Sequence, residues 1–374
     1  MIIRNFSKVI AIGIFVFFSF LGFSNSVFAQ EHLEELETYK GKVLESVVVD
    51  CDDISGESEF ICVKYSVEIL DGDRENDSVE TLISAVNSEA DFFKKGKIVY
   101  LSLYSSEEFG DQWNIESYSR EGQLLFLLLI FVVLILLVTG LRGIKAVLGL
   151  VLSFIVIYFV AIPNINSTLN GNILPIAILT VFLLLIASTF VTYGFNRKSL
   201  IAFISSILGV MFIFCVGFVV VKALDISGTG EESAVMLYDT ISKSFSLSSI
   251  YLLGIVIGAL GVLDDVTIGQ VSSMMEIYQT DSSLTSKVLY RKAMNIGKDH
   301  IASMINTLFI AYAGSSFTLV ILLAANNPNF RILINTEFLV EEIVRTLVAS
   351  ICLILVVPVT TYISSIVLVK MKNL

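Results

Sequence analysis

The stretch Leu124–Val138 reads LLFLLLIFVVLILLV and contains no polar or charged side chain. With its flanks it approaches the length of about 20 residues that an α-helix needs to cross the hydrocarbon core of a bilayer. Similar apolar runs follow to the end of the chain. The seven predicted spans cover residues 122–139, 144–162, 173–193, 200–221, 250–270, 301–325 and 343–369. The sequence therefore predicts a polytopic α-helical membrane domain over residues 121–374.

The composition of the whole chain agrees with this class. Its 374 residues are 55% hydrophobic and 16% charged, with a mean hydropathy of +0.83, whereas an ordinary soluble domain is about 25% charged. The charges are also segregated, because residues 30–120 hold 22 acidic and 8 basic side chains, a net charge of −14. A segment this acidic repels nucleic acid, so no nucleic-acid partner is expected.

The acidic segment 30–120 is predicted to be a small β-rich barrel or sandwich. Its β-branched and aromatic runs are separated by clusters of Gly, Asp, Ser and Asn; they read GKVLESVVVD, FICVKYSVEIL, SVETLISAV and KGKIVYLSLY. Residues 71–77 carry alternating carboxylates, but Asn76 stands where a calcium loop needs glycine, which favours a solvated hairpin tip. Cys51 and Cys62 could form a disulfide or remain free thiols, and no metal site is expected.

Residues 1–29 have the pattern of a signal peptide or an uncleaved signal anchor. Arg4 and Lys8 precede an apolar core, and small residues end with Ala29. Either interpretation makes the β-rich domain extracytoplasmic. The loops that would then be cytoplasmic, together with the C-terminus, hold ten Lys and Arg residues, against three in the outside loops. We expect a multi-pass cell-membrane protein with a cytoplasmic C-terminus and lipid as its surroundings.

Glycine, serine and acidic residues recur at helical spacing in the fifth predicted span. The positions are Gly254, Gly258, Gly261, Asp265, Gly269, Ser272 and Glu276. Glycines at this spacing allow another backbone to approach closely, so this face is predicted to meet another helix, in the same chain, in a second copy or in a partner membrane protein. Asp265 lies midway along the face, with Asp264 and Thr267 beside it. A carboxylate at this depth requires a partner, a proton or water.

The sixth predicted span gathers its polar residues on one half of the helical circumference. The acidic face of the fifth span is their predicted partner, because neither face belongs against lipid. The candidate intramembrane polar or ion site is Asp264, Asp265, Thr267, Ser303, Asn306 and Thr307. The candidate helix-packing positions are Gly254, Gly258, Gly261, Gly269 and Gly314. Residues Gly297, Lys298, Asp299 and His300 are expected at the cytoplasmic end of the sixth span.

The two stretches GALGVLDDVTIGQVSSMMEI and RKAMNIGKDHIASMINTLFIAYAGSSF resemble the signature region of the YibE/F family of multipass membrane proteins. In that family a glycine-rich helix with an aspartate precedes a Gly-(Arg/Lys)-Asp turn and an Asn-Thr-Leu helix. The matching residues are Gly258, Gly261 and Asp265, then Gly297, Lys298 and Asp299, then Asn306, Thr307 and Leu308. The pair Asp264–Asp265 departs from the single acidic residue of many members. The resemblance implies a fold and carries no established biochemical activity.

The leading functional hypothesis is a transporter or permease for a small solute or ion, coupled to protons or cations. Asp265 would load the proton or cation, because carboxylates inside a helix bundle are typical of such relays. The alternative is a non-catalytic assembly or signalling protein whose β-rich domain binds an extracytoplasmic partner. An intramembrane aspartyl protease is disfavoured, since the Gly-x-Gly-Asp motif near Asp299 is incomplete and no Tyr-Asp pair occurs within the predicted spans. No enzyme motif, cofactor or metal site is expected.

Overall fold

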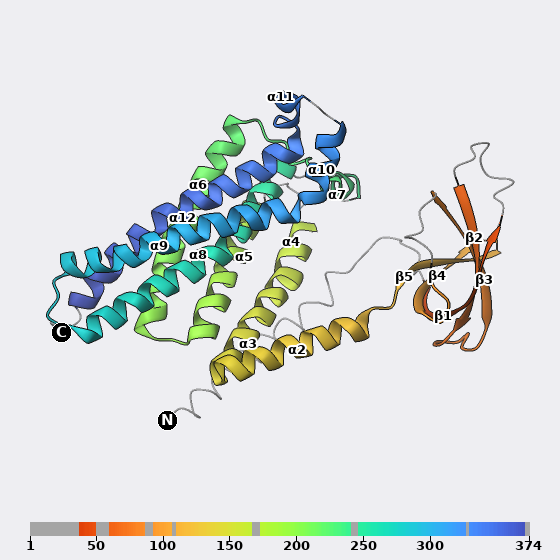
Figure 1. Ribbon diagram of the computed structural model, residues 1–374, viewed down its shortest axis with the longest axis horizontal. Coiled ribbons are helices and arrows are strands. Elements are labelled where there is room, and N and C mark those ends of the chain that lie inside the picture. Colours follow the sequence, from red (N-terminus) through yellow and green to blue (C-terminus); the bar gives the residue numbers. More distant parts are fainter. Residues whose placement is uncertain are drawn as a thin grey trace. The chain divides into compact units, whose positions relative to one another are not determined.

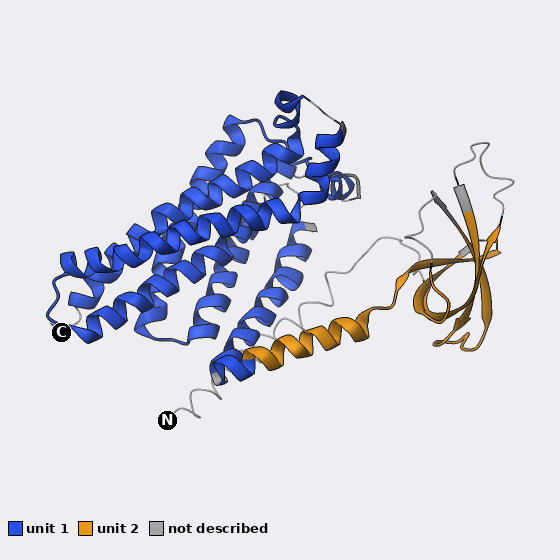
Figure 2. Cartoon of the chain, viewed as in Figure 1, with its two compact units in different colours: residues 1–27, 136–374 blue, residues 28–135 orange. Residues whose placement is uncertain are grey.

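The computed structural model describes residues 37–49, 60–86, 93–106, 110–166, 173–240, 246–326 and 329–370. The chain forms two compact units, residues 28–135 and a second unit whose described part lies within residues 136–370 (Figures 1 and 2). The predicted signal segment 1–29 and Cys51 lie outside the described residues, whereas Cys62 is disulfide-bonded.

The first unit contains a five-stranded antiparallel sheet, which confirms the predicted β-rich domain. The strands are β1 (Glu37–Val49), β2 (Phe60–Ile69), β3 (Ser78–Val86), β4 (Ile98–Ser106) and β5 (Gly110–Tyr118), in the order β3-β2-β1-β4-β5. Strand β4 returns to pair with β1, which makes β1 to β4 a Greek key. The Thr81 hydroxyl on β3 donates a hydrogen bond to the Trp113 carbonyl on β5 at 2.5 Å, so the two edges of the sheet meet. A five-stranded Greek-key barrel is the architecture of the OB-fold, although architecture alone assigns no ligand.

Alternation along the strands builds the core of this unit. Val43, Tyr65, Val67, Val99 and Leu101 are almost completely buried, because residues two apart on a strand face the same side of the sheet. Strand β5 was not predicted, since its sequence GDQWNIESY contains little apolar alternation.

The acidic loop 71–77 connects β2 to β3, as expected for a hairpin tip. Arg74 in this loop forms an ion pair with Asp111 on β5, with 2.9 Å between Nη1 and Oδ2, and its guanidinium lies over the Trp113 ring. The backbone N–H of Lys40 on β1 donates to the Asp71 carboxylate at 2.6 Å. The loop is therefore bound to two strands through its charged side chains.

Helix α2 (Glu121–Thr139) begins directly at the sheet. Its first residue, Glu121, accepts hydrogen bonds from Tyr100 and Ser119 and lies 3.0 Å from the Lys40 ammonium. No residue of α2 is buried. An apolar helix without a buried stripe fits an environment of lipid on every side.

The second unit is a bundle of long helices (Figure 1). Among the described residues, six helical segments are long and apolar enough to cross a membrane, and there are seven if the bent pair of α9 and α10 is one span. The protein is thus an integral multipass membrane protein. The helical elements after α2 are α3 (Leu141–Val156), η2 (Ile157–Ala161), α4 (Ile162–Asn166), α5 (Leu174–Ile186), η3 (Ala187–Val191), α6 (Arg197–Ala223), α7 (Glu232–Thr240), α8 (Leu247–Thr280), α9 (Ser286–Ser315), α10 (Phe317–Asn326), α11 (Phe330–Leu333) and α12 (Glu337–Lys370).

The sixth span differs most from its prediction as one apolar run over residues 301–325. Helix α9 starts at Ser286 and ends at Ser315, and α10 follows after a bend of 63°. Ser316 leaves the helical conformation, with φ −102° and ψ 12°. Glycine and serine next to each other are a common cause of such kinks, and Gly314, Ser315 and Ser316 supply them here.

Candidate functional site

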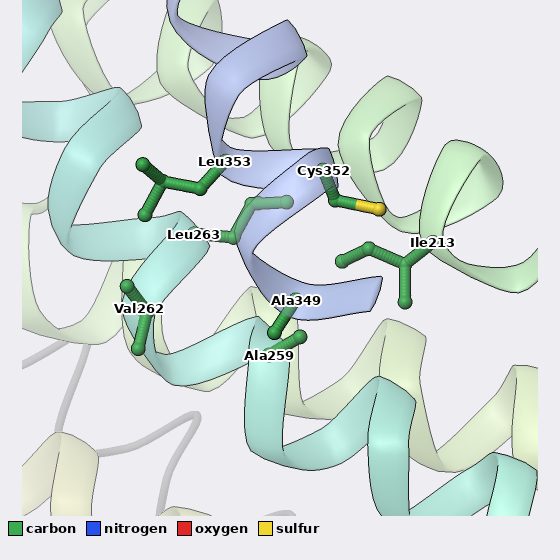
Figure 3. Close-up of a pocket in the computed structure, with 7 residues that line it drawn as sticks. All are labelled: Ile213, Ala259, Val262, Leu263, Ala349, Cys352 and Leu353. Carbon is green, nitrogen blue, oxygen red and sulfur yellow. The ribbon is translucent and has the colours of Figure 1, made fainter. Parts of the chain in front are cut away.

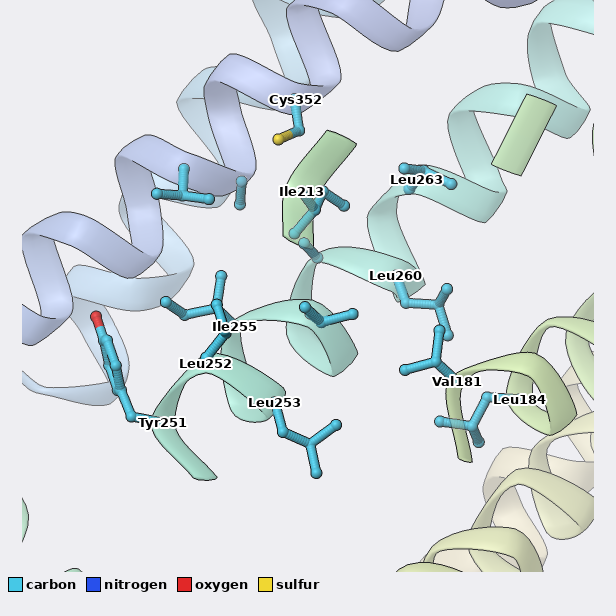
Figure 4. Close-up of a cluster of buried hydrophobic side chains, with 14 of the residues drawn as sticks. Val181, Leu184, Ile213, Tyr251, Leu252, Leu253, Ile255, Leu260, Leu263 and Cys352 are labelled. Atoms are coloured by element: carbon cyan, nitrogen blue, oxygen red, sulfur yellow. The ribbon is translucent and has the colours of Figure 1, made fainter. Parts of the chain in front are cut away.

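Helix α8 lies at the centre of the bundle and contacts α5, α6, α9 and α12. Large apolar side chains cover one broad side of its first half, from Tyr251 to Leu263, and pack against Val181 and Leu184 on α5 and Cys352 on α12 (Figure 4). The Tyr251 hydroxyl donates to the Glu341 carbonyl of α12 at 2.6 Å. Burial of this apolar side fixes the rotation of α8 in the bundle.

Three polar side chains of α8 continue along the buried side, which we call the polar hub: Asp264, Thr267 and Gln270. The relative exposures are 6% for Asp264 and 0% for the other two. Spacing of three residues brings them to one side of the helix. Each bonds to a different part of the bundle, so the polar hub joins α8 to its neighbours by side-chain hydrogen bonds.

The contacts of the polar hub are specific. The Thr189 hydroxyl of η3 donates to Asp264 Oδ1 at 2.9 Å. The hydroxyls of Thr267 and Ser206 on α6 lie 2.8 Å apart.

Gln270 completes the polar hub. Its Nε2 donates to the Ala293 carbonyl of α9 at 3.0 Å and to the Thr361 hydroxyl of α12 at 2.9 Å. These bonds span four neighbouring elements, because Asp264 and Thr267 reach η3 and α6.

Local backbone features allow these contacts. The segment η3 is π-helical, and single π-helical turns within α-helices are rare and frequently found at functional sites. Gly297 on α9 lets that helix approach Gln270, because an added Cβ would lie 3.2 Å from Gln270 Nε2 and 2.7 Å from Val357 Cγ1. The predicted turn at Gly297–Asp299 is therefore wrong, since these residues lie inside α9.

The electrostatic character of the polar hub is one carboxylate among neutral groups. Asp264 forms no ion pair with any described residue. The Oε1 atom of Gln270 and the hydroxyl of Thr360 are buried without a hydrogen-bond partner among described groups. The Asp264 carboxylate and the Thr189 hydroxyl bonded to it offer oxygen ligands to a hard cation, or a site for a proton.

The opposite side of α8 is open. Gly254, Gly258, Gly261 and Asp265 are exposed in the single chain. An added Cβ at Gly254 or Gly261 would meet no atom within 4 Å. The predicted packing of this face against the sixth span occurs only in part: Gly258 and Gly269 lie near Tyr312 and His300 of α9, whereas Gly254 and Gly261 have no neighbour. Successive residues of a helix point about 100° apart, and the bundle buries the side with the larger apolar residues, which includes Asp264 and leaves Asp265 outside.

The polar residues of α9 are likewise on the surface of the single chain. Ser303, Asn306, Thr307 and Gly314 are exposed, and the Thr307 hydroxyl donates to the Ser303 carbonyl within the same helix at 3.0 Å. Among the described residues, no hydrogen bond joins Asn306 to the acidic face of α8. Instead α9 turns Leu308 inward and brings Tyr312 against Gly258.

The predicted cytoplasmic-end residues Lys298, Asp299 and His300 lie on α9 near Gly269 of α8. His300 is half-buried, with its Cε1 3.7 Å from a Cβ added at Gly269. Lys298 and Asp299 are exposed. No group of three His, Cys, Asp or Glu side chains suited to a metal ion occurs in the described part of the chain.

A comparison with known families bears on the whole membrane unit. The family model described as YibE/F-like protein matches residues 127–370, which covers α8, α9 and the polar hub. The chain belongs to the YibE/F-like family. The searches of curated proteins and of solved structures found no significant match to it.

One residue of the polar hub and three of its bonding partners in this YibE/F-like chain were missed from sequence. All four residues, Thr189, Ser206, Gln270 and Thr361, are buried. Three of them stand in pairs of small polar residues within apolar runs, whereas Gln270 stands among glycine and serine in the sequence IGQVSS. Such a residue carries no periodicity of its own. The signal that was available is that polar groups buried in a membrane bundle need partners, which would have selected these residues together.

A small cavity lies beside the hub in this YibE/F-like bundle (Figure 3). It has a volume of about 10 Å³ and is lined by apolar side chains of α6, α8 and α12, with Ile213, Leu263 and Cys352 among them. This volume is close to the minimum that a single water molecule needs, and water in a cavity also needs polar partners. The cavity is therefore too small and too apolar to be a solute path.

Proposed function

We propose that this YibE/F-like protein is a membrane transporter rather than an enzyme, and that it moves a small solute or ion with a proton or cation bound at Asp264. The observation that supports this most strongly is the buried carboxylate of Asp264, held by Thr189 of the π-helical segment η3. Ionisable residues that face a bundle interior in the membrane are rare and commonly belong to ion or proton pathways.

Binding of a proton or cation at Asp264 is coupled to helix packing, because a buried charge is unfavourable without a partner. A charged Asp264 without an ion-pair partner carries a large desolvation penalty, which a bound proton or cation removes. The ligands for a cation would be the Asp264 carboxylate and the Thr189 hydroxyl. The Thr267 hydroxyl, which pairs with Ser206, donates to the backbone carbonyl of Asp264 at 3.0 Å. Since these groups join α8 to η3 and α6, a change in loading acts directly on three membrane segments.

This proposal moves the loading residue by one position. The sequence favoured Asp265, but Asp265 lies on the open side of α8, whereas Asp264 is 6% exposed. Asp265 therefore provides a matched control: it is the same residue type, one position away, on the open side of the helix.

Charge displacement in proteoliposomes tests the proposal. Purified protein is reconstituted and adsorbed on a solid-supported membrane, and jumps in Na⁺ concentration or in pH are applied. We expect a transient current in the wild type for at least one of the two jumps, its loss in Asp264→Asn, and its retention in Asp265→Asn. An equal current in Asp264→Asn, or no current in folded wild-type protein for either jump, would refute the proposal.

A non-catalytic assembly or signalling role is the second candidate function. The observation in its favour is the dense bundle, in which the cavity near Leu263 is small and apolar. In that case the polar hub only fixes helix packing, and the barrel of β1 to β5 binds an extracytoplasmic partner. Folded protein that gives no current with either ion would favour this role over transport.

We also propose that the β-rich unit is extracytoplasmic and the C-terminus cytoplasmic. The support is the excess of Lys and Arg in the loops that this orientation makes cytoplasmic. Single cysteines at exposed positions Glu45 on β1 and Lys292 on α9 provide the test, with an impermeant thiol reagent applied to whole cells. Labelling of the Glu45 position alone is expected, and labelling of the Lys292 position alone would reverse the orientation.

A further inference from the structure

The open side of α8 and the exposed polar residues of α9 lie on two helices in contact, and we call these residues together the α8–α9 face. It consists of Gly254, Gly258, Gly261 and Asp265 on α8 and of Ser303, Asn306, Thr307 and Gly314 on α9, all exposed in the single chain. Both helices belong to membrane-crossing segments. A carboxylate and an amide in the middle of such segments are unfavourable against lipid tails, which offer no hydrogen bonds.

The depth of each residue on this face follows from three close approaches between α8 and α9. Gly258 lies against Tyr312, Gly269 against His300, and Gln270 against Gly297. Numbers rise along α8 as they fall along α9, so the two helices run antiparallel with a constant register. By this register Asn306 is level with the turn between Gly261 and Asp265, and Gly314 is level with the turn between Gly254 and Gly258.

This register makes the face complementary to itself. A two-fold axis along the membrane normal keeps every residue of a second copy at its own depth. The carboxylate of Asp265 in one copy then meets amide and hydroxyl donors of Asn306 and Ser303 in the other. The glycines of α8 likewise meet the depth of Gly314, where small residues permit close backbone approach.

We propose that two copies of this chain form a symmetric dimer through the α8–α9 face, with Asp265 of each copy accepting hydrogen bonds from Asn306 and Ser303 of its partner. The second copy is the favoured occupant because acceptor and donors lie at one depth on the same surface. The proposal is independent of transport, since the polar hub with Asp264 lies inside each chain.

The first test is the mass of the protein in nanodiscs by native mass spectrometry, over a range of protein-to-disc ratios. Gly261→Trp fills a position with no atom within 4 Å, so the variant leaves the subunit fold intact, as an unchanged melting temperature would show. The matched control is Val219→Trp on α6, a position that is 63% exposed in the single chain.

We expect dimers in the wild type and in Val219→Trp. The dimer dissociation constant of Gly261→Trp should be at least about tenfold higher than that of the wild type. A monomeric wild type overturns the proposal. Dimers that persist unchanged in Gly261→Trp overturn it too. So does a wild-type mass that contains a lipid or a different protein, if this molecule stays bound in Val219→Trp and is lost in Gly261→Trp.

A second test uses disulfide cross-linking in native membranes. Chains with Gly261→Cys and a first tag are coexpressed with chains that carry Thr307→Cys and a second tag, with Cys215 and Cys352 replaced by alanine. Oxidation should yield a covalent product that carries both tags. Coexpression of Val219→Cys with Thr307→Cys is the control, and equal yields from both pairs would contradict the proposed face.

Discussion

The two sides of α8 lie in different environments. On one side Asp264, Thr267 and Gln270 are buried and bonded to η3, α6, α9 and α12. On the other side Asp265 and the glycines are open in the single chain. Two adjacent aspartates thus have opposite environments. The comparison shows that in a membrane bundle the rotation of a helix is set by apolar packing and by polar bonds together, and that small residues do not by themselves mark the inside.

The largest stability effect is expected for Gln270→Ala. The substitution leaves a cavity and removes the partner of the Thr361 hydroxyl and the Ala293 carbonyl, so the free energy of unfolding should fall by about 2–4 kcal/mol. Unfolding in mixed micelles measures it. Ser272→Ala is the control, because Ser272 bonds only within its own helix. Equal losses in the free energy of unfolding for Gln270→Ala and Ser272→Ala would contradict the distinction between the buried and open sides of α8.

The glycines offer the next comparison. An added Cβ at Gly209 on α6 would lie 2.4 Å from Leu263 Cδ1 and 2.8 Å from Val356 Cγ2, whereas one at Gly261 meets nothing within 4 Å. Gly209→Ala should therefore lower the free energy of unfolding by about 1–3 kcal/mol through overpacking. The same unfolding assay on Gly261→Ala should show no comparable loss. A larger loss in Gly261→Ala than in Gly209→Ala would contradict the assignment of the Gly261 side as the open side of α8.

A smaller effect is expected for Thr267→Val, which keeps the shape and removes the hydroxyl that faces Ser206. The expected loss is about 1 kcal/mol in the free energy of unfolding. A double-mutant cycle with Ser206→Ala isolates the pair, since both hydroxyls bond to each other at 2.8 Å. Strict additivity of the two substitutions would show that the hydrogen bond contributes nothing measurable.

The smallest effect is expected for Gly254→Ala on the open side. In the monomer its stability should change by less than about 0.5 kcal/mol, because no neighbour stands near the new methyl group. Thermal unfolding of monomer in detergent measures this. A destabilisation comparable to that of Gly209→Ala would mean that Gly254 is packed within the chain.

Several features of the fold were predictable because they depend on runs of residues. The uniformly apolar segment of α2 gives a span, and the alternating runs of β1 to β4 give strands. The family signature around Gly258 and Asn306 was also readable, and the family match over residues 127–370 confirms it. The break at Ser316 was not predicted, since the apolar pattern continues across it into α10.

The candidate site was predicted only in part. Asp264 and Thr267 were selected, but Asp265, Ser303 and Asn306 were grouped with them, and the structure separates the two sets. A helical wheel places Asp264 and Asp265 about 100° apart without showing which angle faces the bundle. That choice depends on neighbours from elsewhere in the chain.

By itself the sequence determined the membrane class, the positions of the spans and the acidic β-rich domain, because hydropathy, alternation and charge are local properties. Only the tertiary structure decided the rotation of α8, the π-helical position of Thr189, and the meeting of Asp264 with it. These depend on distant segments: Thr189 and Asp264 are 75 residues apart in the chain. Packing brings them together because the large apolar side chains of α8 make more contacts inside the bundle than its glycines would.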